Sequence, residues 1–205
     1  MRRALAAAAA ICMLASPVLA QDETKWNHGG AYAGLAAGYS AAVLQSSDPI
    51  DWGASGLMGG AYAGYGFLGR SGVYVGVELD ATLKDIKWKA SDGGGTTVEA
   101  SGRWLGSFRA RVGQALGPML LYATGGLALT DQKIAVTGIG SDTEWRYGWV
   151  AGVGAEAMLT KTVTLRLEGL HYDFAEKGFN LGGLGTEKLG TQENVVRVGV
   201  SFKLN

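Results

Sequence analysis

The chain has 205 residues, with 34 glycines, 3 prolines and 1 cysteine, and its 18 basic residues balance 18 acidic residues. This balance excludes a polybasic nucleic-acid-binding protein and a highly charged disordered chain. The mean hydropathy of +0.11 is reached without a long apolar run after residue 20, which excludes a membrane protein built from helices. Apolar and polar residues must therefore alternate over short distances.

The first 20 residues have the features of a secretory signal peptide. Arg2 and Arg3 supply the positive start, residues 4–14 are apolar, and Val18-Leu19-Ala20 is a small-x-small type of cleavage site. The sequence therefore predicts export from the cytoplasm and removal of this segment.

Lipidation at Cys12 is the alternative for this N-terminal segment. A lipidation motif has a small residue before the cysteine, whereas Ile11 stands there, and the apolar stretch continues past Cys12. An ordinary secretory signal peptide without lipidation is therefore favoured. We predict a periplasmic leader at 21–29 and a single domain at 30–205.

The dominant period after the leader is two, and residues 72–83 show it most clearly. Apolar residues at odd positions alternate there with mainly polar or small residues at even positions. Successive side chains of a strand point to opposite faces, so the segment is predicted to be a strand with one apolar face. Eight segments share this design, and they are 30–40, 56–67, 72–83, 103–112, 119–130, 144–159, 163–174 and 196–204.

The connections between these segments alternate in length. Antiparallel neighbours can be joined by tight turns, so short connections are predicted at one end of the sheet and long loops at the other. The short connections are 68–71, 115–118 and 160–162, and the long ones are 41–55, 84–100, 131–143 and 175–193.

An antiparallel barrel with one apolar face has two interpretations. A soluble barrel turns that face inward, whereas a membrane barrel turns it toward lipid. The alternating loop lengths favour the membrane, as do strands near the length of about nine to eleven residues that crosses it. Aromatic residues near strand ends also suit a lipid–water boundary, and they are Tyr39, Tyr65, Trp104, Trp145, Tyr147 and Trp149.

Each of the eight predicted strands carries a short motif of its own. The motifs are GAYAGLAAGY at 30–39, 60–65, GVELD at 76–80, SFRARVG at 107–113, 121–127, GWVAGVGAE at 148–156, LRLE at 165–168 and VRVG at 196–199. In their order, these motifs resemble the small eight-stranded outer-membrane β-barrel proteins of the porin family or outer-membrane β-barrel domain type, which are α-proteobacterial surface antigens. The resemblance implies an all-β fold, an eight-stranded antiparallel up-and-down transmembrane barrel in the outer membrane of a Gram-negative bacterium. It also implies short periplasmic turns and four longer extracellular loops.

The last strand resembles the assembly signal that the outer-membrane insertion machinery recognises. The matching residues are Arg197, Gly199, Phe202 and Leu204. The family usually ends on phenylalanine, whereas here Leu204 takes that place and Asn205 follows. The resemblance implies, as partners, the barrel assembly machinery and periplasmic chaperones during biogenesis, and outer-membrane lipid with lipopolysaccharide afterwards.

An eight-stranded barrel has an interior only wide enough for side chains to fill it, and buried charges are costly unless they are paired. We therefore expect Glu78 and Asp80 on the third strand to face Arg109 and Arg111 on the fourth. A plugged barrel is the main interpretation, and a proton or solute path lined by the same residues is the alternative. The predicted interior charge network comprises Glu78, Asp80, Arg109, Arg111, Glu156, Arg166, Glu168 and Arg197.

No catalytic, cofactor-binding or metal-binding residue is predicted. His28 lies in the leader, and His171 points outward beside Asp173, which could orient it, but its strand carries no serine. Two distant histidines without a cysteine in the mature chain do not make a transition-metal site. Gly93-Gly94-Gly95 lacks the following helix and the lysine of a phosphate loop. The sequence thus favours a protein that is not an enzyme.

The predicted function is a structural, surface-exposed role in the bacterial envelope. Adhesion through the extracellular loops is one alternative, and a small passive channel is another. Ligand capture is a third, for example of haem by Trp52, Trp88 and Trp145 near the loop bases. The interfacial aromatic girdle already accounts for these tryptophans, and eight strands leave little room for a channel.

Overall fold

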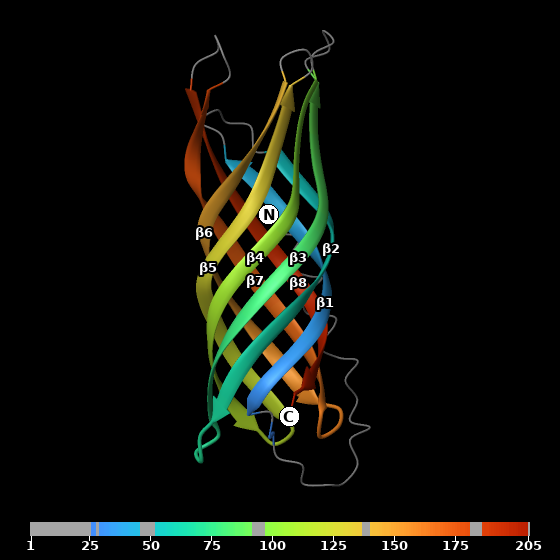
Figure 1. Ribbon diagram of the computed structural model, residues 1–205, viewed down its shortest axis with the longest axis vertical. Coiled ribbons are helices and arrows are strands. Elements are labelled where there is room, and N and C mark those ends of the chain that lie inside the picture. The colour runs from blue at the N-terminus through green and yellow to red at the C-terminus, as the bar shows by residue number, and fades with distance from the viewer. Residues whose placement is uncertain are drawn as a thin grey trace, which may run out of the picture.

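Eight antiparallel strands pair in chain order, and β1 also pairs with β8 to close a barrel (Figure 1). The predicted fold class is therefore confirmed. The strands are β1 Gly30–Gln45, β2 Trp52–Leu68, β3 Val73–Ser91, β4 Thr97–Leu116, β5 Met119–Val136, β6 Gly140–Met158, β7 Val163–Asn180 and β8 Thr186–Lys203.

The computed structural model describes residues 26–27, 29–45, 52–91, 97–136, 140–180 and 186–204. Side chains are described for 26–27, 29–42, 55–84, 103–131, 145–175 and 191–204. The predicted signal peptide and most of the predicted leader lie outside these residues. Within the described residues, no helix is long and apolar enough to cross a membrane.

All eight strands extend beyond the predicted bounds on the side of the long connections. Where alternation predicted a strand at 72–83, β3 continues to Ser91, and its Trp88 pairs with Ala100 of β4. The predicted bounds of the long loops are therefore wrong. An antiparallel ladder needs only backbone N–H and C=O groups, so it continues where the apolar alternation used for the prediction has ended.

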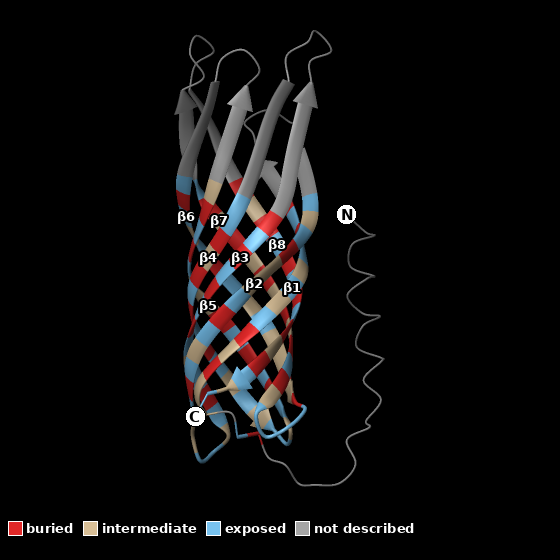
Figure 2. Ribbon diagram, turned by 45° about the vertical axis from the view of Figure 1, so that its right-hand side comes forward, coloured by how far each residue is buried: buried red, intermediate tan, exposed pale blue. Residues whose placement is uncertain are grey.

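Exposure alternates from residue to residue along the strands, as Figure 2 shows. On β3, Val77 and Leu79 expose 46% and 61% of their surface, whereas Glu78 and Asp80 between and after them expose 1% and 7%. Apolar side chains thus cover the outside of the barrel and charged side chains lie inside. This is the arrangement of a membrane barrel and the inverse of a soluble one.

Tight turns join the strands at one end of the barrel. Gly72 and Gly117 in two of these turns have φ angles of +80° and +58°, which glycine adopts without the steric cost that other residues meet. Short turns face the periplasm in outer-membrane barrels, so this end is assigned to the periplasm and the opposite end to the cell exterior.

Candidate functional site

The interior is built from ion pairs between neighbouring strands. Glu78 lies directly opposite Arg109 in the β3–β4 ladder, and the two buried side chains form an ion pair. Inward-facing residues on adjacent strands share a rung, so the register alone brings opposite charges together. The register likewise places Glu156 opposite Arg166 and Glu168 opposite Arg197. In each pair the arginine Nε donates a hydrogen bond to the carboxylate, at 2.6 Å and 2.7 Å respectively.

Further ion pairs cross the interior between strands that are not neighbours. Arg109 Nη1 on β4 lies 3.3 Å from Glu168 Oε1 on β7, and Arg166 Nη1 on β7 lies 2.7 Å from Glu78 Oε2 on β3. The structure brings together all eight residues of the predicted network, each in at least one ion pair and each buried: Glu78, Asp80, Arg109, Arg111, Glu156, Arg166, Glu168 and Arg197. Four carboxylates thus balance four guanidiniums in the low-dielectric interior.

Tyrosine rings complete this layer. The guanidinium Cζ of Arg111 lies 3.9 Å from the ring centroid of Tyr122, and that of Arg166 lies 4.1 Å from the centroid of Tyr62. A cation close to an aromatic ring is stabilised by the negative face of the ring. The Tyr122 hydroxyl also donates to Glu168 Oε1 at 2.7 Å. These tyrosines were not predicted as members of the network, although each occupies an inward position of its strand.

Interior glycines make room for the tyrosines. A Cβ atom at Gly34 would lie 2.5 Å from Cζ of Tyr62, which pairs with it across β1 and β2. A Cβ at Gly64 would likewise meet the ring of Tyr32. The large and small residues of paired strands therefore interlock inside the barrel.

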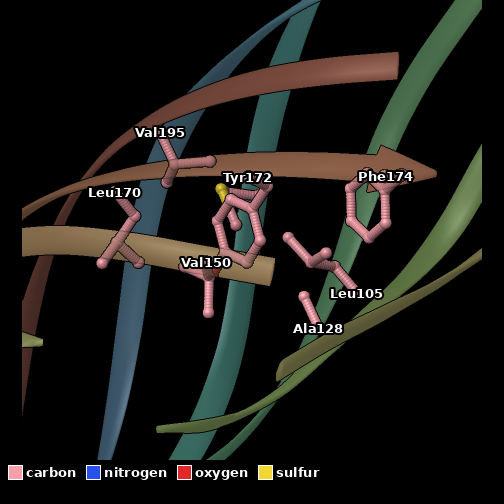
Figure 3. Packing of buried hydrophobic residues seen from close by; sticks show 8 residues of the cluster. Leu105, Ala128, Val150, Leu170, Tyr172, Phe174 and Val195 are labelled. Atoms are coloured by element: carbon pink, nitrogen blue, oxygen red, sulfur yellow. The ribbon is translucent and has the colours of Figure 1, made fainter. Parts of the chain in front are cut away.

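Two buried apolar clusters flank the ion pairs along the barrel axis. The outer cluster, whose packing Figure 3 shows, lies toward the cell exterior, because along β4, β6, β7 and β8 its members lie beyond the charged residues of the predicted network on the side of the long connections. The turn cluster lies beside the periplasmic turns and also contacts Leu68 and Ala115. The outer cluster comprises Met58, Leu105, Ala128, Val150, Leu170, Tyr172, Phe174 and Val195. The turn cluster comprises Trp26, Tyr74, Leu120, Tyr122 and Met158.

Trp26 precedes the first strand and nevertheless belongs to the turn cluster, with 3% of its surface exposed. Its backbone N–H donates to the carbonyl of Gly117 in a periplasmic turn at 2.7 Å. The Lys203 ammonium donates to the Asn27 carbonyl at 2.9 Å. The end of the predicted leader is thus held against the periplasmic opening.

A separate buried ion pair lies nearer the cell exterior, outside the predicted network, and was not predicted. The Lys84 Nζ atom lies 2.6 Å from Glu193 Oε2, and the Ser40 hydroxyl donates to Glu193 Oε1 at 2.6 Å. Lys84 and Glu193 fall in segments where long loops were expected, so the prediction gave them no inward orientation.

His171 faces outward, and its neighbours differ in part from those expected. Its Nδ1 atom lies 2.9 Å from the Asn194 side-chain oxygen, and its ring lies 5.5 Å from that of Trp149. Asp173, which was expected to orient the imidazole, instead accepts a hydrogen bond from Gln192 at 3.2 Å. Asn194 takes this place because it lies directly opposite His171 in the β7–β8 ladder.

The remaining candidates lie at the surface or outside the described side chains. Trp145 faces outward with 52% of its surface exposed, whereas the Trp52 and Trp88 side chains, His28 and Gly93–Gly95 lie outside the described part. In the described part, no cluster of His, Cys, Asp and Glu is placed to hold a metal ion.

The residues of the predicted assembly signal divide between the two faces of β8 and its end. Arg197 and Gly199 face the interior, and Phe202 faces outward with 51% of its surface exposed. Leu204 follows β8, and its backbone N–H donates to the Ala31 carbonyl at 2.8 Å. Recognition of these residues by the insertion machinery stays a prediction.

A closed barrel with an apolar outer wall and a charged interior is an integral outer-membrane β-barrel. The chain belongs to the outer membrane protein beta-barrel domain family, whose model matches residues 6–203. Its location in the outer membrane and its resemblance to α-proteobacterial surface antigens are thereby confirmed.

Two relatives and one solved structure illustrate the similarity. The chain is 36% identical over 194 residues to the 25 kDa outer-membrane immunogenic protein of Brucella canis, covering 92% of this chain and 84% of the relative. It is 34% identical over 148 residues to the 22 kDa outer membrane protein of Rhizobium leguminosarum bv. viciae, covering 72% of this chain and 66% of the relative. The crystal structure of Neisserial surface protein A (NspA) matches with a TM-score of 0.54 and 16% identity, over 85% of this chain and 99% of that one. This last match shows the fold alone.

Proposed function

We propose that this protein is a structural, surface-exposed component of the outer membrane whose interior is closed to solutes and which catalyses no reaction. The observation that carries this proposal is the arrangement of the balanced ion pairs between two buried apolar clusters. A solute would have to displace both clusters and separate the ion pairs.

The energetics support a closed interior. Removing one partner from a buried ion pair costs about 3–5 kcal/mol, because the other charge remains buried without compensation. Glu78 illustrates the constraint, since its carboxylate lies close to the guanidiniums of Arg109, Arg111 and Arg166 at the same time. Opening a path through this layer would disturb several such contacts together.

The relatives support exposure at the cell surface. The relatives from Brucella are named outer-membrane immunogenic proteins, and a similar presentation of the extracellular side is proposed for this chain. The proposed partners are outer-membrane lipid and lipopolysaccharide, with the assembly machinery and periplasmic chaperones acting during biogenesis.

Planar-bilayer recording of the purified, folded protein tests the closed interior. The folded state is first verified by heat-modifiable mobility on gels, and heat-unfolded protein from the same preparation serves as the control for contaminating pores. We expect no reproducible conductance steps from the folded protein. Reproducible steps in the nanosiemens range that disappear on unfolding would contradict the proposal and favour a channel.

The absence of catalysis is tested separately at His171, because a histidine on the lipid-facing side of the barrel could act on the acyl chains of lipid A. Its contacts with Asn194 and Trp149 support a role in the barrel wall. Mass spectra of lipid A from the wild-type strain and from a strain lacking this protein are expected to be identical. Loss of a deacylated lipid A species in the deletion strain, restored by the wild type but not by His171→Ala, would establish an enzyme.

A further inference from the structure

The lipid-facing wall changes from apolar to polar at the same rung of β7 and β8. On β7 the outward residues run from Leu165 and Leu167 to His171, and on β8 Val196 is followed toward the cell exterior by Asn194. His171 and Asn194 are direct partners in the ladder. The polar residues therefore form one patch across the two strands.

This polar patch consists of two hydrogen-bonded pairs and one aromatic ring. The first pair is His171 with Asn194 at 2.9 Å, and the second is Gln192 with Asp173 at 3.2 Å. The ring of Trp149 borders the patch on β6, 5.5 Å from the imidazole. Each pair uses only part of the hydrogen-bonding capacity of its groups, so donors and acceptors remain for a ligand. Outward tryptophans mark the lipid–water boundary of a membrane protein. The two pairs lie beside one, so they lie at the level of the lipid headgroups.

An apolar groove lies below the patch on the same wall. Its volume is about 820 Å³, and it crosses β3 to β7, from Val73 and Gln114 near the periplasmic turns up to Gly169. Gly169, two residues before His171 on the same face, lines the groove, and a Cβ atom there would meet no atom within 4 Å. The outward side chains that line the groove with Gly169 include Val112, Leu121, Ala123, Val153 and Leu167.

We propose that the patch and the groove together bind one glycolipid of the outer leaflet, an inference that rests on the proposed function, in which lipopolysaccharide is a partner. The sugar headgroup hydrogen-bonds to the patch and lies beside Trp149, and an acyl chain occupies the groove that begins at Gly169. Two carboxamides and a carboxylate suit the hydroxyl and amide groups of a sugar. The carboxylate of Asp173 would repel a phosphate, so the sugar is the part of the headgroup that this patch selects.

Native mass spectrometry of the folded protein in detergent tests the site, with rough lipopolysaccharide as the probe and phosphatidylglycerol as the competitor. Asn194→Leu removes the partner of His171 from a lipid-facing position, and Gly169→Leu fills the top of the groove.

Two control variants make similar changes elsewhere on the outer wall. Tyr39→Phe removes another outward hydrogen bond, to Ser55, and Gly59→Leu fills an outward position of β2, where the nearest atom to a Cβ would be 3.7 Å away. Heat-modifiable mobility verifies that every variant is folded.

Both site variants are expected to bind the lipopolysaccharide at least about fivefold more weakly, the effect of one lost hydrogen bond or a comparable loss of packing. Both controls are expected to bind as the wild type does, and phosphatidylglycerol is expected not to displace the glycolipid. Equal binding by the site variants and the controls would overturn the proposal. Displacement by phosphatidylglycerol at equal concentration would overturn it as well, because it would show a wall that accepts any lipid.

Discussion

Glu78 on β3 and Arg109 on β4 face each other across one rung and form an ion pair with no exposed side-chain surface. Arg109 also approaches Asp80 at 3.1 Å and Glu168 at 3.3 Å, so it joins carboxylates from two sides of the barrel. This connection makes the ion pairs one cooperative unit, and its disruption should affect the whole barrel.

Replacement of Arg109 by methionine should lower the free energy of unfolding by about 3–5 kcal/mol, because buried carboxylates lose their compensating charge. The double variant Glu78→Leu/Arg109→Met should be destabilised by less than the sum of the two single variants, since it removes both members of the pair. Urea unfolding in lipid vesicles measures all three changes. Strictly additive effects would show that the two side chains do not interact energetically.

Gly34→Ala should destabilise the barrel by about 1–3 kcal/mol, because the new methyl group would overlap the ring of Tyr62 and the backbone oxygen of Val200. Gly59→Ala on the lipid-facing side is the matched control, since its nearest atom would be 3.7 Å away. The two midpoints of urea unfolding are compared. Equal midpoints would argue against close packing between paired glycines and tyrosines.

Trp26→Ala should lower the free energy of unfolding by about 3–5 kcal/mol, because it removes a buried aromatic side chain from the turn cluster at the periplasmic end and leaves a cavity there. Trp26→Phe should retain most of the stability, since it keeps an aromatic ring in the cluster. Unfolding curves of the two variants provide the comparison. A Trp26→Ala protein as stable as the wild type would mean that the tryptophan does not seal this end.

Much of the barrel could be predicted because one physical pattern is repeated in every strand. The alternation around Val77 and Leu79 identified the outward face, and charge opposition then placed Glu78 and Arg109 inside. The pattern ends near Leu83, although the ladder continues. The strand ends and the Lys84–Glu193 pair were therefore missed.

Other contacts depend on three-dimensional closeness that periodicity does not encode. Trp26 lies outside every alternating segment. It is buried because it packs into the turn cluster at the periplasmic end and its backbone N–H donates to the Gly117 carbonyl. The partner of His171 was likewise set by the register between β7 and β8, which places Asn194 opposite it. A prediction from residues near His171 in sequence selected Asp173 instead.

Phe202→Ala should reduce the amount of folded protein in the outer membrane several-fold if the end of β8 is the assembly signal. The residue faces outward with 51% of its surface exposed, so its truncation leaves the interior packing unchanged. Val198→Ala, an outward residue of the same strand outside the signal, is the control. Heat-modifiable bands in outer-membrane fractions report folded protein. Equal reductions in both variants would assign the effect to the strand in general.

In a membrane barrel of this design, the apolar outer row contacts hydrocarbon while the charges pair inside the barrel. The direct test is electron paramagnetic resonance of a nitroxide attached at Leu79→Cys, in a chain without residues 1–20 that has been folded into lipid vesicles. Arg70→Cys, in an exposed periplasmic turn, is the aqueous reference. We expect the label at 79 to collide more with oxygen than with a water-soluble nickel chelate, and the label at 70 to show the opposite preference. Preferential collision with the nickel chelate at 79 would contradict this arrangement.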